Sequence, residues 1–287
     1  PVVDHGVSAY PQEVTTAMVS NMLKGGAASS VLARQFNIPM AIIDVGVMTP
    51  QASPAESDIR LFRSDMAAKG CVGDLAVAKA MDERTFDAAV LAGIDAVDRL
   101  GHCRLLIIGE LGIGNTTVAA AVAAAVLKVP AEDMVGRGTG LDDKGMIRKI
   151  NVVKQALNAC SATDGASAIM QVGGRELAAM YGAIGRAAEV KIPVLIDGFV
   201  AGAAAAALVH DYPYAKGRLI WAHRSAERGH LQLLNMIGAT GLLDLNMRLG
   251  EASGALTAFP LLESACALHN EMATFADAQV PEKDESK

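Results

Sequence analysis

The feature that most constrains the fold is an alternation of short aliphatic runs with longer helical patterns. The short runs are rich in β-branched and aliphatic residues, and the longer runs repeat their apolar residues at helical spacing. This order is typical of a parallel sheet whose successive strands are joined by helices. The sequence therefore predicts an α/β fold in which a parallel sheet carries helices on both faces.

The expected strands are 40–45, 104–108, 193–196 and 218–221, and the expected helices are 11–23, 82–100, 116–127, 142–159, 175–188 and 198–210. From residue 227 onward the pattern is helical, without a strand candidate. We therefore expect an α/β nucleotide-binding domain over 25–226. Residues 1–24 together with 227–287 are expected to form a small helical domain, and the charged tail 281–287 is expected to fray.

Composition excludes several classes of function. The chain of 287 residues is 52% hydrophobic and 20% charged, which is enough to bury a large core and excludes disorder. Its net charge is −6 without a Lys/Arg cluster, so nucleic-acid binding is not expected. The apolar runs are shorter than the roughly 18 residues that span a bilayer, so no membrane association is expected. The expected partner is a small molecule.

The cysteines at 71, 103, 160 and 266 have neither metal-ligand spacing nor the pattern of a disulfide framework. They are interpreted as reduced, mostly buried thiols of a cytoplasmic protein that needs neither metal nor cofactor. The first residues, 1–6, read like the end of a strand. They predict that a further N-terminal segment precedes residue 1.

A glycine-rich loop, 109–117, follows one expected strand and precedes a long helix. Ligands of open α/β sheets bind at the carboxyl ends of strands, where helix N-termini offer N–H groups and a positive dipole end. Asn115 is expected to cap the helix. The loop lacks the Gly-Lys-Ser/Thr of a Walker A motif, and its glycines are in the wrong order for G-x-G-x-x-G. Ligand binding and simple packing both remain open.

A second glycine loop, 136–143, leads into a helix that carries Arg148, Lys149 and Lys154, with Asp142 as the expected N-cap. Taken alone, this region is interpreted as a flexible connector followed by a solvated basic face. If the two glycine loops close on one phosphorylated ligand, Lys149 would meet its phosphate or ribose as a point charge.

Two further loops carry polar side chains. Residues 222–230 contain His223, Ser225 and His230 but no hydrolase or zinc motif, so Ser225 is expected to hydrogen-bond a ligand or cap a helix. In 247–255, Glu251 stands between glycines before an apolar helix. That carboxylate is either a partner of the helix dipole or a functional group.

Five motifs together, 109–117, 173–180, 193–199, 222–230 and 247–255, closely resemble the nicotinate-nucleotide–dimethylbenzimidazole phosphoribosyltransferase family. The resemblance runs in order from Asp4 to Phe275. It implies a Rossmann-like α/β domain, a small helical domain, a homodimer and a helical segment before Asp4. It also implies transfer of the 5-phosphoribosyl group of nicotinate mononucleotide to 5,6-dimethylbenzimidazole or a related base.

The resemblance assigns roles to residues. Glu251 would be the general base, although Ala252 replaces the glycine that often follows it, and Glu110 and Lys149 would lie near the nucleotide. Some members have Ser and Gln where this chain has Tyr10 and Met18, which leaves the acceptor open. The remaining positions are Leu111, Gly112, Asn115, Thr116 and Gly138 around phosphate and ribose, and Ser8, Tyr10, Met18 and Leu249 around the acceptor.

Two other classes of function stay open. A dinucleotide-dependent oxidoreductase also needs a glycine-rich turn after a parallel strand, and Glu132 or Asp133 would then supply its acidic ribose contact. A non-catalytic nucleotide-binding relative is the third class. Retention of Glu251, Glu110 and Lys149 together argues against it.

Overall fold

The computed structural model describes residues 2–48, 57–64, 73–138 and 140–280. In this part of the chain the strands form two parallel sheets. β1 (Ala41–Asp44) pairs with β2 (Arg60–Arg63). The second sheet is three-stranded in the order β3-β4-β5, built from β3 (Leu106–Ile108), β4 (Val194–Ile196) and β5 (Leu219–Trp221). The expectations for Cys71 and the tail 281–287 fall outside the described residues.

The four predicted strands from residue 40 onward and the predicted helices are confirmed with small shifts at their ends, whereas β2 and the helices at 28–35, 131–134 and 165–172 were not predicted. The reading of the first residues as the end of a strand is wrong, because residues 2–5 form a 3-10 turn. The sequence of β2, Arg-Leu-Phe-Arg, is a short apolar pair between charges, too brief to show a period. The helices and turns are η1 (Val2–His5), α1 (Glu13–Leu23), α2 (Ala28–Gln35), α3 (Glu83–Leu100), α4 (Asn115–Leu127), α5 (Ala131–Met134), α6 (Asp143–Ala159), α7 (Gly165–Val172), α8 (Arg175–Glu189), α9 (Phe199–Asp211), η3 (Pro213–Arg218), α10 (Arg228–Ile237) and α11 (Ser253–Glu271).

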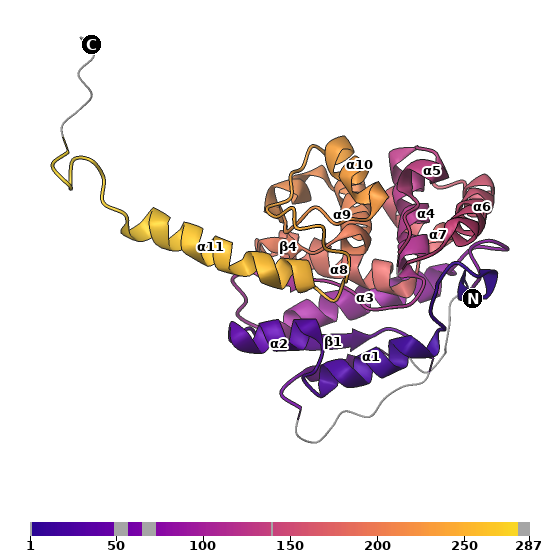
Figure 1. Ribbon diagram of the computed structural model, residues 1–287, viewed down its shortest axis with the longest axis horizontal. Coiled ribbons are helices and arrows are strands. Elements are labelled where there is room, and N and C mark those ends of the chain that lie inside the picture. Colours follow the sequence, from indigo (N-terminus) through magenta and orange to yellow (C-terminus); the bar gives the residue numbers. More distant parts are fainter. Residues whose placement is uncertain (1, 49–56, 65–72, 139, 281–287) are drawn as a thin grey trace, which may run out of the picture.

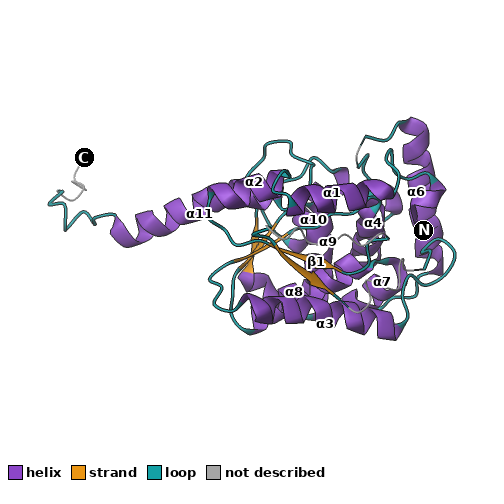
Figure 2. Ribbon diagram, turned by 90° about the horizontal axis from the view of Figure 1, so that it is seen from below, coloured by secondary structure: helices purple, strands orange, loops and turns teal. Residues whose placement is uncertain are grey.

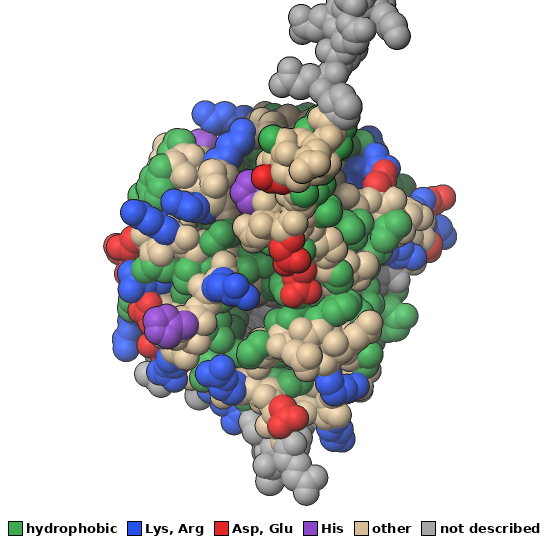
Figure 3. Space-filling model, turned by 90° about the vertical axis from the view of Figure 1, so that its left-hand side faces the viewer, with side chains coloured by type: hydrophobic (Ala, Val, Ile, Leu, Met, Phe, Trp, Pro, Cys, Tyr) green, Lys and Arg blue, Asp and Glu red, His purple; other side chains and the backbone are tan. Residues whose placement is uncertain are grey.

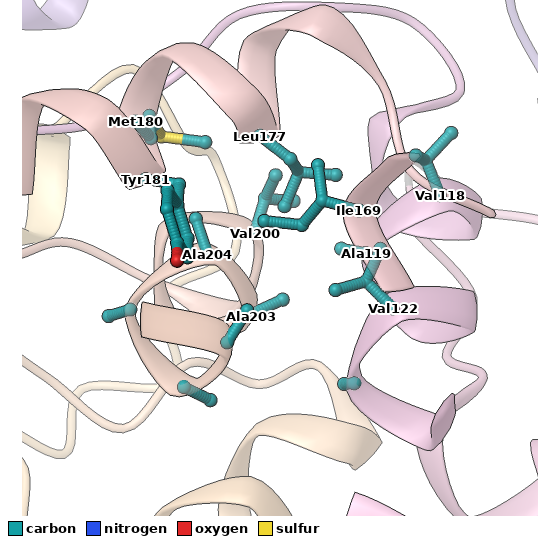
Figure 4. Packing of buried hydrophobic residues seen from close by; sticks show 14 of the residues in the cluster. Val118, Ala119, Val122, Ile169, Leu177, Met180, Tyr181, Val200, Ala203 and Ala204 are labelled. Carbon is teal, nitrogen blue, oxygen red and sulfur yellow. The ribbon is translucent and has the colours of Figure 1, made fainter. Parts of the chain in front are cut away.

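Two alanine-rich helices, α4 and α9, form the centre of the hydrophobic core. They pack against each other and against α7, with α8 on the other side of α9. Figure 4 shows Val122 and Ala119 of α4 facing Ile169 of α7, with Val200 and Ala203 of α9 beside them. Because alanine side chains are small, helices of this kind approach closely and bury their whole circumference. These helices start at the sheet's carboxyl edge and hold their N-termini there.

Helices cover the strands on both sides, as expected for this class of fold. In Figure 2 the strands lie between α3 and α8 below and α2 and α11 above. α3 and α8 approach so closely that a side chain at Gly93 or Gly182 would collide with the facing backbone. None of the helices in the described ranges is both long and apolar enough to cross a membrane.

The last helix, α11, starts beside β3 and α2 and then leaves the body of the molecule (Figure 1). Its C-terminal half is exposed. α10, by contrast, packs on α5 and α9. The proposed division into 25–226 and 1–24 with 227–287 stays a prediction.

The thiols differ from expectation. Cys103 and Cys160 are half-buried and Cys266 on α11 is exposed, so the described cysteines are free but not mostly buried.

Candidate active site

A cavity lies at the carboxyl edge of the three-stranded sheet, where loops that are far apart in the sequence converge. Its wall comes from the loops that follow β3, β4 and β5 and from the segment that precedes α11. The lining residues are Val7, Ser8, Glu110, Leu111, Gly112, Ile113, Gly114, Asn115, Thr116, Gly138, Asp197, Gly198, Phe199, Val200, Ala201, His223, Ser225, Glu227, Arg248, Leu249 and Gly250.

The loop between β3 and α4 places the positive end of α4 at this cavity. The N-cap is Gly114, whose φ of 95° lies in the left-handed region. The prediction that Asn115 caps the helix is therefore wrong: Asn115 is already helical, and its side chain donates to the Glu110 carboxylate. The N–H of Ile113 donates to Thr15 Oγ1 at 3.0 Å, so α1 holds the loop in place.

Lys149 lies beneath the cavity wall. Its side chain is 0% exposed, and Nζ donates to Thr116 Oγ1 at 2.8 Å and to the carbonyl oxygen of Gly136 at 2.9 Å. Burial lowers the Lys149 pKa to about 8, against an opposing effect of Glu227. The interpretation of Lys149 as part of a solvated basic face is thus wrong. Its side chain instead links the second glycine loop, through Gly136, to α4, through Thr116. The predicted N-cap Asp142 is confirmed, since it accepts from the N–H of Gly145 at 2.7 Å.

Glu251 lies at a strained point of the backbone. Gly250, Glu251 and Ala252 have φ values of 84°, 61° and 62°, a left-handed run that non-glycine residues rarely adopt. The Glu251 N–H donates to the carbonyl oxygen of Glu110 at 3.1 Å. α11 begins only at Ser253, so Glu251 is not a dipole partner within its first turn.

The carboxylate of Glu251 faces another helix. It accepts from the backbone N–H of Ser29 in the first turn of α2, while Oε2 is buried without a hydrogen-bond partner in the described structure. The residue is 5% exposed. Burial and, to a lesser extent, the charge of Asp197 raise the Glu251 pKa, which makes this carboxylate a stronger base.

Glu110 is a buried carboxyl group of the cavity wall with a strongly raised pKa. Burial raises its pKa to about 8, and the nearby carboxylates of Glu176, Asp197 and Glu251 act in the same direction. The hydrogen bond from Asn115 opposes these effects. Glu110 is therefore largely protonated at neutral pH in the free protein.

Asp197, at the carboxyl end of β4, was not among the predicted site residues. Its Oδ1 accepts from the N–H of Ala255 at 2.9 Å and lies 3.7 Å from His223 Nε2. Burial raises the Asp197 pKa, while His223 and the backbone N–H groups at the start of α11 oppose the rise. Its position directly after a buried parallel strand is the signal that could have found it.

The residues expected around the acceptor divide into two groups. Ser8 and Leu249 line the cavity, and Leu249 is 61% exposed at its edge. Tyr10 and Met18 do not line it. Met18 is three residues from Thr15 on α1 and shares its helix face, so it lies near the loop that Thr15 holds.

Ser225 also lines the cavity, with its Oγ accepting from the N–H of Glu227 at 3.2 Å. It is not a helix cap, because the N-cap of α10 is Glu227. Across the described ranges, no group of three or more His, Cys, Asp or Glu side chains could hold a metal ion.

A family model described as phosphoribosyltransferase matches residues 1–280. A relative from Bradyrhizobium sp. strain BTAi1, named nicotinate-nucleotide–dimethylbenzimidazole phosphoribosyltransferase, is 45% identical and covers 99% of this chain and 80% of its own length. A protein of the same name from Chloroflexus aurantiacus strain J-10-fl is 43% identical, covering 98% and 80%.

A crystal structure of the Thermus thermophilus protein of that name superposes with a TM-score of 0.88 at 38% identity, covering 98% of this chain and 83% of that one. The fold is thus that of a phosphoribosyltransferase. The chain belongs to the nicotinate-nucleotide–dimethylbenzimidazole phosphoribosyltransferase family.

These comparisons do not support the oxidoreductase alternative, and the structure gives the physical reason. After α4 the described chain continues into α5 and α6 instead of a second strand. Glu132 lies in α5 and pairs with Lys154 on the surface, so it offers no ribose contact at a strand end.

The raised pKa of Glu110 predicts a pH effect on stability. Between about pH 5 and 8 the folded protein keeps a proton that the unfolded chain has lost, so this group's contribution to stability falls as pH rises. The slope is at most about 1.4 kcal/mol per pH unit. Thermal unfolding at several pH values between about 5 and 8 should show that Glu110→Gln loses less stability with rising pH than the wild type does. Identical pH dependence of both proteins would contradict the pKa.

Proposed function

We propose that the protein transfers the 5-phosphoribosyl group of nicotinate mononucleotide to 5,6-dimethylbenzimidazole or a related base, giving α-ribazole 5′-phosphate and nicotinate. The observation that carries the proposal is the polarity of the cavity. The α4 N-terminus with Lys149 beneath it suits the anionic phosphate, and the Glu110 and Asp197 carboxyl groups suit a cationic sugar.

The proposed transfer requires a general base but no general acid. The nicotinate ring nitrogen that is bonded to C1′ already carries a positive charge, so nicotinate leaves as a stable pyridine without being protonated. As this bond breaks, C1′ gains oxocarbenium character. A cation beside Glu110 lowers the pKa of that carboxyl group. Glu110 would then ionise when the donor binds and stabilise the positive charge near C1′.

Glu251 is proposed as the general base. Glu251 directly follows the lining residues Leu249 and Gly250 but does not itself line the cavity, and its Oε2 is buried without a hydrogen-bond partner in the described structure. An acceptor bound beside Leu249 would give its N–H proton to this oxygen, while the Ser29 N–H supports the carboxylate. The other nitrogen of the base attacks C1′ from the face opposite nicotinate. That attack inverts the anomeric centre and gives the α-riboside.

Glu251→Gln should lose most of its turnover and keep its affinity for nicotinate mononucleotide. The amide preserves size but accepts no proton, and loss of a general base costs about 10²- to 10⁴-fold. Release of nicotinate in the presence of 5,6-dimethylbenzimidazole measures the rate. Glu83→Gln, an exposed change at the start of α3, is the control. A near-normal rate in Glu251→Gln would contradict the assignment of Glu251 as the general base.

Recognition of the 5′-phosphate should decide which donor the protein can use. Nicotinate riboside lacks the dianion that the α4 N-terminus and the second glycine loop would hold, so it should be a very poor donor in both affinity and turnover. Comparing kcat/KM for riboside and mononucleotide tests this expectation. Similar values would mean that both glycine loops are structural connectors.

A homodimer and a cytoplasmic location are also proposed. Beyond the body of the molecule, α11 exposes Leu261 and Leu268, which lie two helical turns apart on one face, followed by Met272 and Phe275. Figure 3 shows the face from which α11 projects, with hydrophobic side chains over its middle. Apolar surface on an isolated helical arm favours burial against a second copy. The free thiols support the location.

Leu268→Glu should weaken self-association by about tenfold or more, because it would place a charge in the buried interface. Leu268 is 61% exposed in one chain, so the substitution should leave the fold intact. Sedimentation of wild type and variant over a range of concentrations is the measurement. A monomeric wild type, or equal association of both proteins, would contradict the dimer.

A further inference from the structure

Glu227 is an acidic residue of the cavity wall without a counter-ion in contact. It is 7% exposed, at the N-cap of α10, and its Oε2 is sealed against the loop at Gly136 without a hydrogen-bond donor. No Lys, Arg or His nitrogen of the described residues forms an ion pair with it. Lys149 acts on it only at longer range.

A carboxylate in this position is costly unless something donates to it. Removing a charge from water without a partner costs several kcal/mol, so such groups normally have hydrogen-bond donors. The neighbouring groups do not meet this need: the Lys149 amine bonds to Thr116 and Gly136, and Ser225 accepts from the Glu227 backbone. Glu227 lines the cavity, and its other carboxylate oxygen, Oε1, is not sealed in this way, so a ligand in the cavity can donate to the carboxylate through Oε1.

The chemistry of the donor nucleotide limits what that ligand group can be. Nicotinate mononucleotide carries a phosphate and a carboxylate, which repel Glu227, and a pyridinium nitrogen without a hydrogen. Its hydrogen-bond donors at neutral pH are the 2′- and 3′-hydroxyls of the ribose. The benzimidazole N–H is the proton that Glu251 is proposed to accept.

The geometry also suits a sugar at this point. Glu227 lies against Gly136, and the same loop continues to Gly138, which lines the cavity beside Thr116. Thr116 belongs to the first turn of α4, where the phosphate is expected. A ribose whose 5′-phosphate lies at α4 would thus have Glu227 within the same part of the wall.

We propose that Glu227 is a specificity-determining residue that accepts a hydrogen bond from the vicinal hydroxyls of the donor ribose. The inference rests on the proposed function and extends it to the choice of sugar. A site built to bind a hydroxyl discriminates strongly against an analogue that lacks it, because its buried acceptor is then left unpaired.

The test compares nicotinate mononucleotide with its 2′-deoxy and 3′-deoxy analogues in wild type, Glu227→Met and Glu227→Ala. We expect the wild type to prefer the ribonucleotide over at least one analogue by about tenfold or more, and Glu227→Ala to lose that preference. The glycosidic bond of a deoxyribosyl donor breaks more easily than that of the ribosyl donor, but this difference is the same for every protein. It therefore cancels when the ratio of ribosyl to deoxyribosyl rates is compared between wild type and variants. Glu189→Gln, an exposed change on α8, is the matched control and should keep the wild-type ratio.

A merely structural role for Glu227 predicts a different result. Glu227→Ala would then lower stability and all rates together and leave the preference between sugars unchanged, which would overturn the proposal. If Glu227→Ala does not fold, Glu227→Met, which fills a similar volume without a strong acceptor, carries the same comparison. The proposal would equally fail if the wild type turned over all three donors at equal rates.

Calorimetry separates this proposal from the function on which it rests. Glu227→Met, which lacks a strong acceptor, should bind nicotinate mononucleotide about tenfold more weakly but bind inorganic phosphate as the wild type does, because phosphate offers no sugar hydroxyl. Absence of nicotinate release by the wild type with every donor would count against the proposed function alone. Equal binding of nicotinate mononucleotide by wild type and variant would count against the role of Glu227.

Discussion

The hydrogen bond from the Ala255 N–H to the buried Asp197 carboxylate, 2.9 Å long, is the contact on which the site depends. It joins the carboxyl end of β4 to the start of α11, elements far apart in the chain. Because the residues just before α11 have left-handed backbone angles, this anchor holds Glu251 in a conformation that it would not adopt alone. Burial raises the pKa of Glu110 and Glu251, and the charge of the same carboxylate adds a smaller rise, so Asp197 contributes to both the position and the basicity of the site.

Much of this arrangement could be predicted from the sequence, because it follows local rules. Strands β3, β4 and β5 are aliphatic runs between helical patterns, and the loops after parallel strands meet at one edge of the sheet. Asp142 caps its helix as its position predicts. The roles given to Glu251, Glu110 and Lys149 came from family resemblance, because a carboxylate near a helix start or a lysine on a helix has many ordinary explanations.

What the sequence did not predict depends on tertiary contacts. The burial of Lys149 follows from the way the second glycine loop covers α6, and no periodicity reveals it. Asn115 would be a good N-cap by composition, but the left-handed Gly114 takes that position and frees the amide for Glu110. β2 is too short to show a pattern, and the contact of Glu251 with Ser29 joins segments more than half the chain apart.

The contact between Glu251 and Ser29 separates two steps of assembly. The nucleotide cavity is built on the central sheet and α4, whereas the carboxylate of Glu251 is fixed by a helix near the start of the described chain. Local opening that undocks α2 would leave the cavity formed but the Glu251 carboxylate unanchored. With the roles proposed above, such a molecule would bind the donor nucleotide without turning it over, so the docking of one short helix would separate donor binding from catalysis.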